Sequence, residues 1–224
     1  MTAKGKKYKY AVIATDVVIF TIIDSELKVL VIKMKKYPFK NCWAVPGGLI
    51  KIDESVDHAP RRILFEKTGV KDVYLEQLYT FGEVNRDPFG RVVSVAYFAL
   101  VTASGIKLKT SEDYESIDWV SVNNLPGMAY DHKEIVKTAI ERLRSKLEYT
   151  NVVYSLMEKD FSLGDLQKTY EIILGKPIDK RNFRKKLLSL DIVKKTSQRT
   201  IGEAHRPAIL YQFKERKPRV IEIM

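Results

Sequence analysis

The sequence predicts an α/β protein of two domains, and three observations lead to this prediction. Two apolar stretches rich in β-branched residues, 10–23 and 27–34, lie on either side of a turn at Asp24 and Ser25, as in a hairpin. Strand-like and helix-like stretches then alternate irregularly, which is typical of a mixed sheet between helices, an α/β/α sandwich. Beyond this part the chain changes to short helices, two short strands and a more basic composition. We therefore expect domains over residues 1–147 and 148–224.

The composition excludes several classes of protein. A chain of 224 residues that is 45% hydrophobic can build one large core or two small ones. Its single cysteine, Cys42, excludes an internal disulfide and suits a reducing compartment. Three scattered histidines and one cysteine argue against a zinc site. No secretory leader and no long apolar run is visible, so we expect a cytoplasmic protein without a membrane partner.

The positive charge is distributed unevenly along the chain. Residues 1–145 carry 22 Lys or Arg against 18 Asp or Glu, a net charge of +4. Residues 146–224 carry 17 against 10, a net charge of +7. The shorter part is therefore the more basic, which indicates a polyanionic partner for the second domain. A basic surface that only confers solubility is the alternative.

The first domain continues with three more expected strands and a closing helix. The strands cover residues 73–84, 92–103 and 116–120. Asp131 and Glu134 are spaced as a capping box, with Asp131 as the N-cap. Apolar residues follow at helical spacing up to Leu147, which indicates ordinary packing of a helix against the sheet.

The most informative stretch is residues 46–70, where a glycine turn precedes a helix. Gly47 and Gly48 allow a tight turn and let a ligand approach the backbone. Gly69 stands where a helix C-cap glycine belongs. Either Ser55 or Asp57 can cap the helix. We favour Asp57, because Pro60 then falls in the first turn, where no backbone N–H is needed.

This stretch resembles the Nudix box, a long spaced motif. The matching residues are Gly48, Glu54, Arg62, Leu64, Glu66, Gly69 and Val70. Two glutamates of the box are missing, because Ile63 and Lys67 stand in their places. The resemblance implies a domain that holds a nucleoside diphosphate, and a structural role for the pair Glu54 and Arg62.

The two departures bear on metal chemistry. Positions 63, 66 and 67 are spaced so that they share one helix face, which in the family carries carboxylates that hold Mg²⁺. Here only Glu66 keeps a carboxylate, and Lys67 would repel the ion but can pair with a phosphate. We therefore expect no catalytic residue beyond a residual Glu66, no metal site and no required cofactor. A solvated helix charge is the alternative for Lys67.

Several further residues of the first domain are candidates for contacting a bound ligand. Gly47, Gly48, Glu66 and Lys67 belong to the box itself. Lys33 lies at the end of the second strand, where Nudix proteins often have a basic residue that faces the ligand phosphates. The alternative is that Lys33 is only a solvent-exposed charge at the strand end. Arg86 and Arg91 lie in a turn-rich loop, residues 85–91, and could face the ligand or a partner subunit. Ordinary surface charge is the alternative for both arginines.

The second domain has the organisation of a helix-turn-helix. Ser162 can cap a helix over residues 163–174 that Gly175 ends, and Asp179 can cap a second helix over 180–190. In this second helix Phe183, Leu187 and Leu190 align inward. The outward residues have side chains suited to base edges in the major groove of DNA: Arg181, Asn182, Arg184 and Lys185.

Two short strands, 192–196 and 208–213, follow this helix and predict a wing. The polar loop between them covers residues 197–206. Basic residues of the wing are candidates for phosphate contacts that set the register on DNA: Lys194, Lys195, Arg199 and Arg206. A basic amphipathic helix that faces water is the alternative reading of this domain.

Taken whole, the chain resembles bacterial Nudix-related transcriptional regulators. Residues 85–97 and 179–186 look like motifs of this group, which includes the NrtR branch, responsive to ADP-ribose, and an AraR-like branch, responsive to arabinose. A lysine at position 67, where the Nudix box has a glutamate, resembles the NrtR branch. The loss of the carboxylates at positions 63 and 67 also fits the AraR-like branch. The resemblance implies a homodimeric repressor on a two-fold operator. Two alternatives stay open: an active Mg²⁺-dependent hydrolase of ADP-ribose or a nucleoside diphosphate sugar, and an RNA-binding module.

Overall fold

The computed structural model describes residues 10–69, 71, 73–104, 106, 108, 114–200 and 207–221. Val70 and Arg206, which the motif and the wing prediction include, lie outside this part of the chain. Within it, no helix combines the length and apolar character that crossing a bilayer requires.

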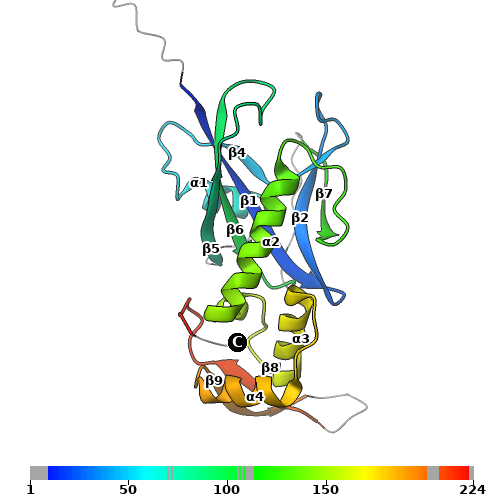
Figure 1. Cartoon of the computed structure of the whole chain (residues 1–224), viewed down its shortest axis with the longest axis vertical. Helices are drawn as coiled ribbons and strands as arrows, with labels where there is room; N and C mark the ends of the chain where they lie inside the picture. The colour runs from blue at the N-terminus through cyan, green and yellow to red at the C-terminus, as the bar shows by residue number, and fades with distance from the viewer. Residues whose placement is uncertain are drawn as a thin grey trace, which may run out of the picture.

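The first domain is built on one seven-stranded mixed sheet (Figure 1). Its central strands β1 and β6 run parallel, and the other pairs are antiparallel, so the predicted mixed sheet is confirmed. Asp24 and Ser25, both with positive φ, form the tight turn between β1 and β2. The strands are β1 (Val12–Ile23), β2 (Glu26–Met34), β3 (Trp43–Ala44), β4 (Gly47–Leu49), β5 (Tyr74–Phe81), β6 (Val92–Leu100) and β7 (Tyr114–Ser121).

One helix packs on each face of this sheet, which confirms the predicted sandwich. Helix α1 (Ala59–Thr68) buries Ile63 and Leu64 against residues of β1, β2 and β6. Helix α2 (His132–Tyr149) buries Ile135, Val136, Ala139, Leu143 and Leu147 on the opposite face. The sheet therefore has a separate apolar cluster on each side.

The start of α1 differs from the expected one. Its N-cap is His58, without a side-chain cap, and not Asp57. The Asp57 carboxylate instead accepts a hydrogen bond from the Tyr97 hydroxyl at 2.9 Å, so the sheet holds this side chain away from the helix end. Pro60 does fall in the first turn, and Gly69 ends the helix with φ of 70°.

The capping box predicted for α2 is wrong. Asp131 is the N-cap residue, but its carboxylate makes no cap hydrogen bond. It accepts two hydrogen bonds from the Arg86 guanidinium, at 2.8 and 2.6 Å, because an ion pair with a buried arginine competes with the cap. The helix also continues to Tyr149, past the expected domain boundary at residue 147.

The second domain is a winged helix, as predicted. Ser162 and Asp165 form a capping box at the start of α3, Gly175 ends that helix, and Asp179 caps α4. Sequence inspection missed one strand, β8, which pairs with β10 and makes the wing part of a three-stranded sheet. The elements are η1 (Val152–Ser155), β8 (Phe161–Ser162), α3 (Leu163–Leu174), α4 (Lys180–Ser189), β9 (Val193–Arg199) and β10 (Ile209–Phe213).

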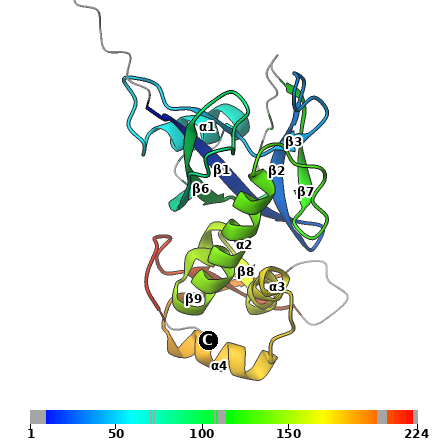
Figure 2. The same ribbon diagram turned by 45° about the horizontal axis from the view of Figure 1, so that its top comes forward.

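The two domains share one apolar core rather than a flexible join. A single cluster of buried residues runs from the sheet through α2 into η1, α3 and α4. The C-terminal segment returns to the end of α2, where Ile221 N donates to Tyr149 O at 2.8 Å and Asn151 Nδ2 donates to Lys217 O at 3.0 Å. Figures 1 and 2 both show α2 reaching from the sheet to the winged helix. The boundary at residue 147 therefore lies inside a continuous helix.

Candidate functional site

A cavity of about 460 Å³ opens over the glycine turn of the first domain. Strands β1 and β2 form its floor with Asp16, Ile32 and Met34. The other lining residues named here come from the glycine turn, the loop before β6, the start of β7 and the start of α2: Gly47, Gly48, Leu49, Arg86, Phe89, Arg91, Tyr114, Tyr130 and His132. The size and the mixture of aromatic, charged and backbone groups suit a small organic ligand.

The glycine turn is not the tight turn with positive φ that was expected, because Gly47 and Gly48 lie extended in strand β4. This strand can pair with β1 only because position 47 has no side chain. Strand β4 pairs with β1, so that Gly47 lies opposite Asp16. A Cβ at Gly47 would lie 2.1 Å from Asp16 Oδ1 and 3.0 Å from the carbonyl oxygen of Thr15. A Cβ at Gly48 would meet nothing within 4 Å. The turn thus packs tightly on one side and leaves its backbone open on the other.

A buried charge network lies beneath the cavity. The Arg86 side chain, 3% exposed, pairs with Asp131 at 2.6 Å and with Asp16 at 3.4 Å. Asp16 also accepts a hydrogen bond from Ser94 Oγ at 2.6 Å. Burial alone would lower the pKa of Arg86, but its bonds to Asp131 and the charge of Asp16 raise it. The guanidinium is therefore permanently charged and held in place.

His132 joins this network from the first turn of α2. Its Nδ1 accepts a hydrogen bond from the backbone N–H of Val45 at 3.1 Å, and its Nε2 lies 3.6 Å from Asp16 Oδ1. Burial lowers the pKa of His132, against the pull of Asp16 and Asp131. The imidazole is thus neutral near pH 7. Through His132 and Asp131, the cavity floor is attached directly to the start of α2.

The structure brings together only part of the predicted ligand set. Gly47, Gly48, Arg86 and Arg91 all line the cavity. Arg91 is exposed and donates one hydrogen bond to the carbonyl oxygen of Glu83 at 3.0 Å. The structure places Arg86 in the buried network rather than on the open surface, so the alternative of ordinary surface charge is wrong for this residue.

Lys33 lies outside the cavity. Its ammonium pairs with Glu115 on the neighbouring strand β7 at 2.9 Å, while Ile32 and Met34 on either side of it line the cavity. Because successive side chains of a strand point to opposite faces, Lys33 faces away. The strand register, which the sequence did not show, decides this outcome.

Residues 63, 66 and 67, which were expected to share one helix face, have different environments in the structure. Ile63 is 2% exposed in the core. Lys67 is 9% exposed, with its ammonium 4.3 Å from the centre of the Tyr114 ring, so the solvated-charge alternative is wrong. The Glu66 side chain is 48% exposed and lies 3.4 Å from Arg62. Glu66 and Lys67 do not line the cavity, although Tyr114 links Lys67 to it.

These residues do not fit a Mg²⁺ ion of the kind that the Nudix box usually holds. The described part of the chain contains no group of three His, Cys, Asp or Glu side chains placed to bind a metal. On this helix face Glu66 keeps an exposed carboxylate, but Ile63 offers no oxygen ligand and the charge of Lys67 repels a cation. By contrast, Arg62 makes the expected structural pair, a two-point contact with Glu54 at 2.7 and 2.9 Å that lowers the pKa of Glu54 to about 2.

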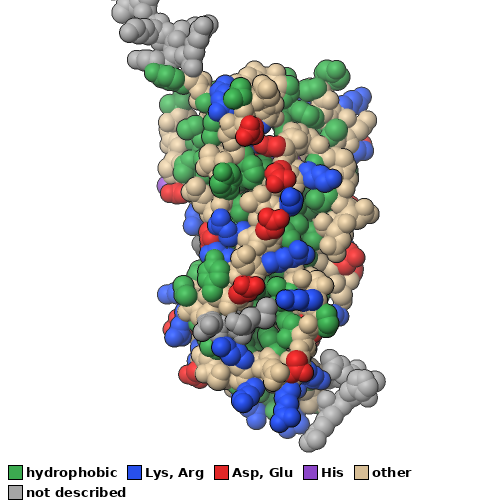
Figure 3. Space-filling view, viewed as in Figure 1, with side chains coloured by type: hydrophobic (Ala, Val, Ile, Leu, Met, Phe, Trp, Pro, Cys, Tyr) green, Lys and Arg blue, Asp and Glu red, His purple; other side chains and the backbone are tan. Residues whose placement is uncertain are grey.

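The winged helix presents a basic end to solvent. Figure 3 shows Lys and Arg side chains gathered at the end of the molecule where α4 lies. On α4, Arg181, Asn182 and Lys185 are exposed, whereas Arg184 is half-buried. On β9, Lys194, Lys195 and Arg199 are exposed. A helix and a neighbouring strand thus offer guanidinium, amide and ammonium groups in the arrangement by which winged helices meet DNA.

Comparison with known proteins matches each of the two domains to a family. Residues 13–141 match the Nudix domain family, and residues 153–213 match the NrtR DNA-binding winged helix domain. The chain is also 36% identical, over 92% of its length and 83% of the relative's, to the "ADPR responsive transcriptional repressor NtrR" of Acinetobacter baylyi. The chain belongs to the NrtR family.

Solved structures of NrtR agree with both halves of this assignment. Shewanella oneidensis NrtR complexed with a 27mer DNA is 35% identical and superposes with a TM-score of 0.80, over 90% of this chain and 93% of that one. The Nudix domain of the same NrtR, complexed with ADP ribose, is 35% identical with a TM-score of 0.55, over 62% of this chain and 93% of that one. The whole two-domain arrangement is therefore shared within the NrtR family.

Several residues of the candidate site were missed in the sequence, and four polar or aromatic ones come from β1, β7 and the start of α2. Asp16, Tyr114, Tyr130 and His132 line the cavity. Asp16 interrupts an otherwise apolar strand, and this buried polar position was a usable signal. Nothing in the sequence around the other three residues indicates a ligand site, because β7 and the start of α2 are brought to the cavity only by folding.

Proposed function

We propose that this protein is a transcriptional repressor that binds operator DNA through its winged helix and responds to ADP-ribose bound in its Nudix domain. The observation that carries the proposal is one helix, α2, that forms part of the cavity at its start and packs in the winged-helix core at its end. A relative covering most of this chain is named an ADP-ribose-responsive repressor. A cytoplasmic location, where DNA is accessible, goes with this function.

The cavity favours ADP-ribose over a free pentose. Its volume of about 460 Å³ suits a ligand with several rings. Arg91 offers an exposed guanidinium for a diphosphate, and Phe89 and Tyr130 offer aromatic surface for a base. A neutral pentose such as arabinose would leave most of this space empty and would give the guanidinium no anionic partner.

The same cavity suggests how a ligand would act on DNA binding. Asp131 is at the N-cap of α2 while its carboxylate is engaged by Arg86. A diphosphate held by Arg91 brings negative charge close to the Arg86–Asp131 pair and to the positive end of the α2 dipole. Helix α2 spans about 27 Å, so a small shift at its start moves the winged helix at its other end.

A second copy of the chain is the partner that we propose for the exposed apolar residues near the cavity. Val12, Ile13, Leu49, Ile52 and Phe89 are each about half exposed or more, and three of them also line the cavity. A cluster of this kind on a single chain marks an interaction site. A two-fold dimer formed there would present two winged helices to a two-fold operator.

The proposal is tested by DNA binding with and without ligand. Fluorescence anisotropy would follow the full-length protein on duplex DNA from upstream of its own gene, at about 150 mM salt, where nonspecific binding is weak. We expect a specific complex whose dissociation constant rises about 5- to 150-fold on adding ADP-ribose. Sedimentation of the same samples would show two chains per duplex.

Four results would contradict the proposal. Absence of a specific complex at this salt concentration excludes the repressor function. Release by arabinose but not by ADP-ribose excludes the effector. Rapid turnover of ADP-ribose with Mg²⁺ or Mn²⁺, lost in Glu66→Gln, would support the hydrolase alternative instead. A preference for single-stranded RNA over duplex DNA would support an RNA-binding module.

A further inference from the structure

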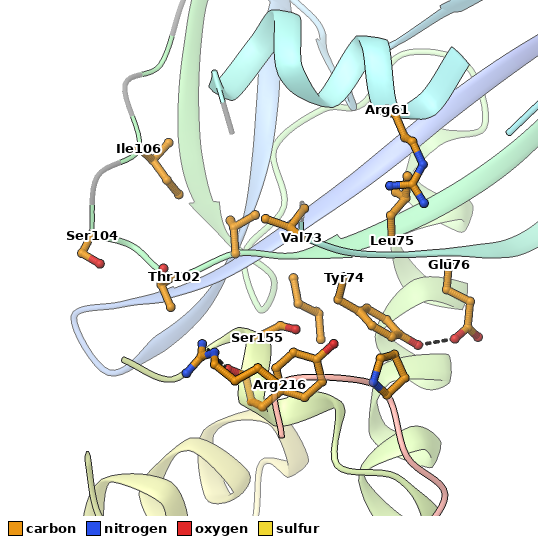
Figure 4. Close-up of a pocket in the computed structure, with 14 residues that line it drawn as sticks. Arg61, Val73, Tyr74, Leu75, Glu76, Thr102, Ser104, Ile106, Ser155 and Arg216 are labelled. Carbon is orange, nitrogen blue, oxygen red and sulfur yellow. Dashed lines mark hydrogen bonds between the residues drawn. The ribbon is translucent and has the colours of Figure 1, made fainter. Parts of the chain in front are cut away.

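A second cavity, of about 500 Å³, lies between the two domains. One wall comes from the start of α1 and from β5 and the end of β6, and the other comes from η1 and the C-terminal segment (Figure 4). It shares no lining residue with the cavity over the glycine turn. Its volume lies in the range of small-molecule sites.

The charge in this cavity is positive. Arg61 extends from α1 toward Leu75, on the side of β5 away from Tyr74 and Arg216 (Figure 4), and has no ion-pair partner among the residues described. Arg216, from the opposite wall, donates to three carbonyl oxygens, those of Tyr154 at 2.7 Å, Met157 at 2.8 Å and Glu158 at 3.3 Å. Neutral carbonyls leave its charge uncompensated.

The acidic residue in the lining does not cancel these two guanidiniums. The Glu76 carboxylate is already paired with Lys146 of α2 at 2.6 Å, and it accepts a hydrogen bond from the Tyr74 hydroxyl. Two arginines therefore face the cavity against a carboxylate that another cation neutralises. An anion entering it would meet net attraction.

The cavity also contains a buried polar atom that lacks a partner. Ser155 is 9% exposed, and its Oγ makes no hydrogen bond within the described structure. Buried hydroxyls are nearly always bonded, so an unpaired one at a cavity wall indicates a missing partner. The rings of Tyr74 and Tyr154 line the same space and offer a surface for a planar group.

We propose that this interdomain cavity binds a small phosphorylated molecule that carries an aromatic ring. Arg61 pairs with the phosphate at one end of the cavity, and Arg216 adds positive charge at the other. Ser155 Oγ bonds a polar group of the ligand, and the tyrosines contact the ring. Guanidinium groups suit phosphate oxygens because their N–H groups form a planar fork. The proposal does not depend on which effector fills the first cavity.

The experiment is isothermal titration of the full-length protein with AMP as the probe, and with adenosine and inorganic phosphate as its separate halves. Arg61→Ala and Ser155→Leu alter the interdomain cavity, the second by filling it. Lys71→Ala removes an exposed cation that does not line it and serves as the matched control. Arg91→Ala and Phe89→Ala alter the first cavity. Thermal melting identifies any variant that fails to fold.

We expect AMP to bind more tightly than either half, and Arg61→Ala to weaken it by at least about tenfold, since one charged hydrogen bond is lost. Ser155→Leu should abolish AMP binding in the interdomain cavity, while Lys71→Ala should leave it unchanged. No detectable binding at about 1 mM AMP would overturn the proposal. So would binding that is lost in Arg91→Ala but kept in Arg61→Ala, because AMP would then occupy the first cavity.

Discussion

Individual residues in the first cavity divide into those that hold the fold and those that face the ligand. Arg86 and Arg91 come from one loop and line one cavity, yet their environments are opposite. The Arg86 side chain is 3% exposed between two carboxylates, whereas Arg91 is exposed and bonds only a backbone carbonyl. Their substitution therefore has different consequences.

Arg86→Ala should destabilise the protein by about 3–5 kcal/mol, because it leaves Asp16 and Asp131 without their buried partner. Arg91→Ala should change stability by less than about 0.5 kcal/mol, as expected for an exposed residue, and weaken ADP-ribose binding by about tenfold. Urea denaturation and titration calorimetry would measure both. Equal stability of the two variants would contradict the assigned environments.

His132 gives the stability of the protein a pH dependence. Burial lowers its pKa below the ordinary value of 6.5, so the unfolded state takes up a proton more readily than the folded state. Its contribution to stability is thus fully present above pH 6.5 and declines as the pH falls below that value. Protonation would also remove the acceptor that Nδ1 offers to Val45 N.

The measurement is the urea midpoint at several pH values between about 5 and 8, around the ordinary histidine pKa. His132→Gln keeps a hydrogen-bond acceptor and removes the titrating group, so the difference between wild type and variant isolates this residue. We expect the wild type to lose stability on acidification more steeply than His132→Gln. Parallel curves would show that His132 does not titrate differently in the folded state.

At the scale of elements, α4 and β9 have different tasks in the proposed DNA contact. Exposed residues of α4, capped by Asp179, are placed to read bases, whereas those of β9 are placed to meet phosphates. Both sets remain predictions, since their contacts depend on a DNA partner.

Arg181→Ala should cost roughly 1–3 kcal/mol on the operator and relax its sequence preference, because a base contact is lost. Lys194→Ala should weaken binding to all sequences about equally and reduce the salt dependence. Competition binding with operator and scrambled duplexes, each at several salt concentrations, distinguishes them. Uniform weakening by Arg181→Ala would place it on the phosphates instead.

At the scale of the whole molecule, α2 and the C-terminal segment join the two domains. A continuous core, the contact of Arg144 Nε with the carbonyl oxygen of Ile173 at 2.9 Å, and the return of Ile221 to Tyr149 all cross between the domains. A signal from the first cavity therefore has a rigid path to the winged helix.

Softening this path should reduce the response to ligand without removing either binding activity. Glu141 is an exposed residue in the middle of α2, and Glu141→Gly costs about 1 kcal/mol relative to Glu141→Ala through helix propensity. We expect Glu141→Gly to keep its affinity for ADP-ribose and for operator DNA, but to show a smaller release of DNA by ADP-ribose. An unchanged response would indicate that the coupling runs outside α2.

By itself, the sequence determined the fold class, the winged helix and the family, because hydrophobic periodicity, capping residues and a long spaced motif are local properties of the chain. The caps of α3 and α4 were predicted correctly for this reason. The tertiary structure alone decided that Lys33 faces away, that Lys67 is buried beside Tyr114, and that Asp131 pairs with Arg86 instead of capping α2. Strand register and contacts between distant segments determine these outcomes, because the partners available to each side chain come close to it only when the chain folds.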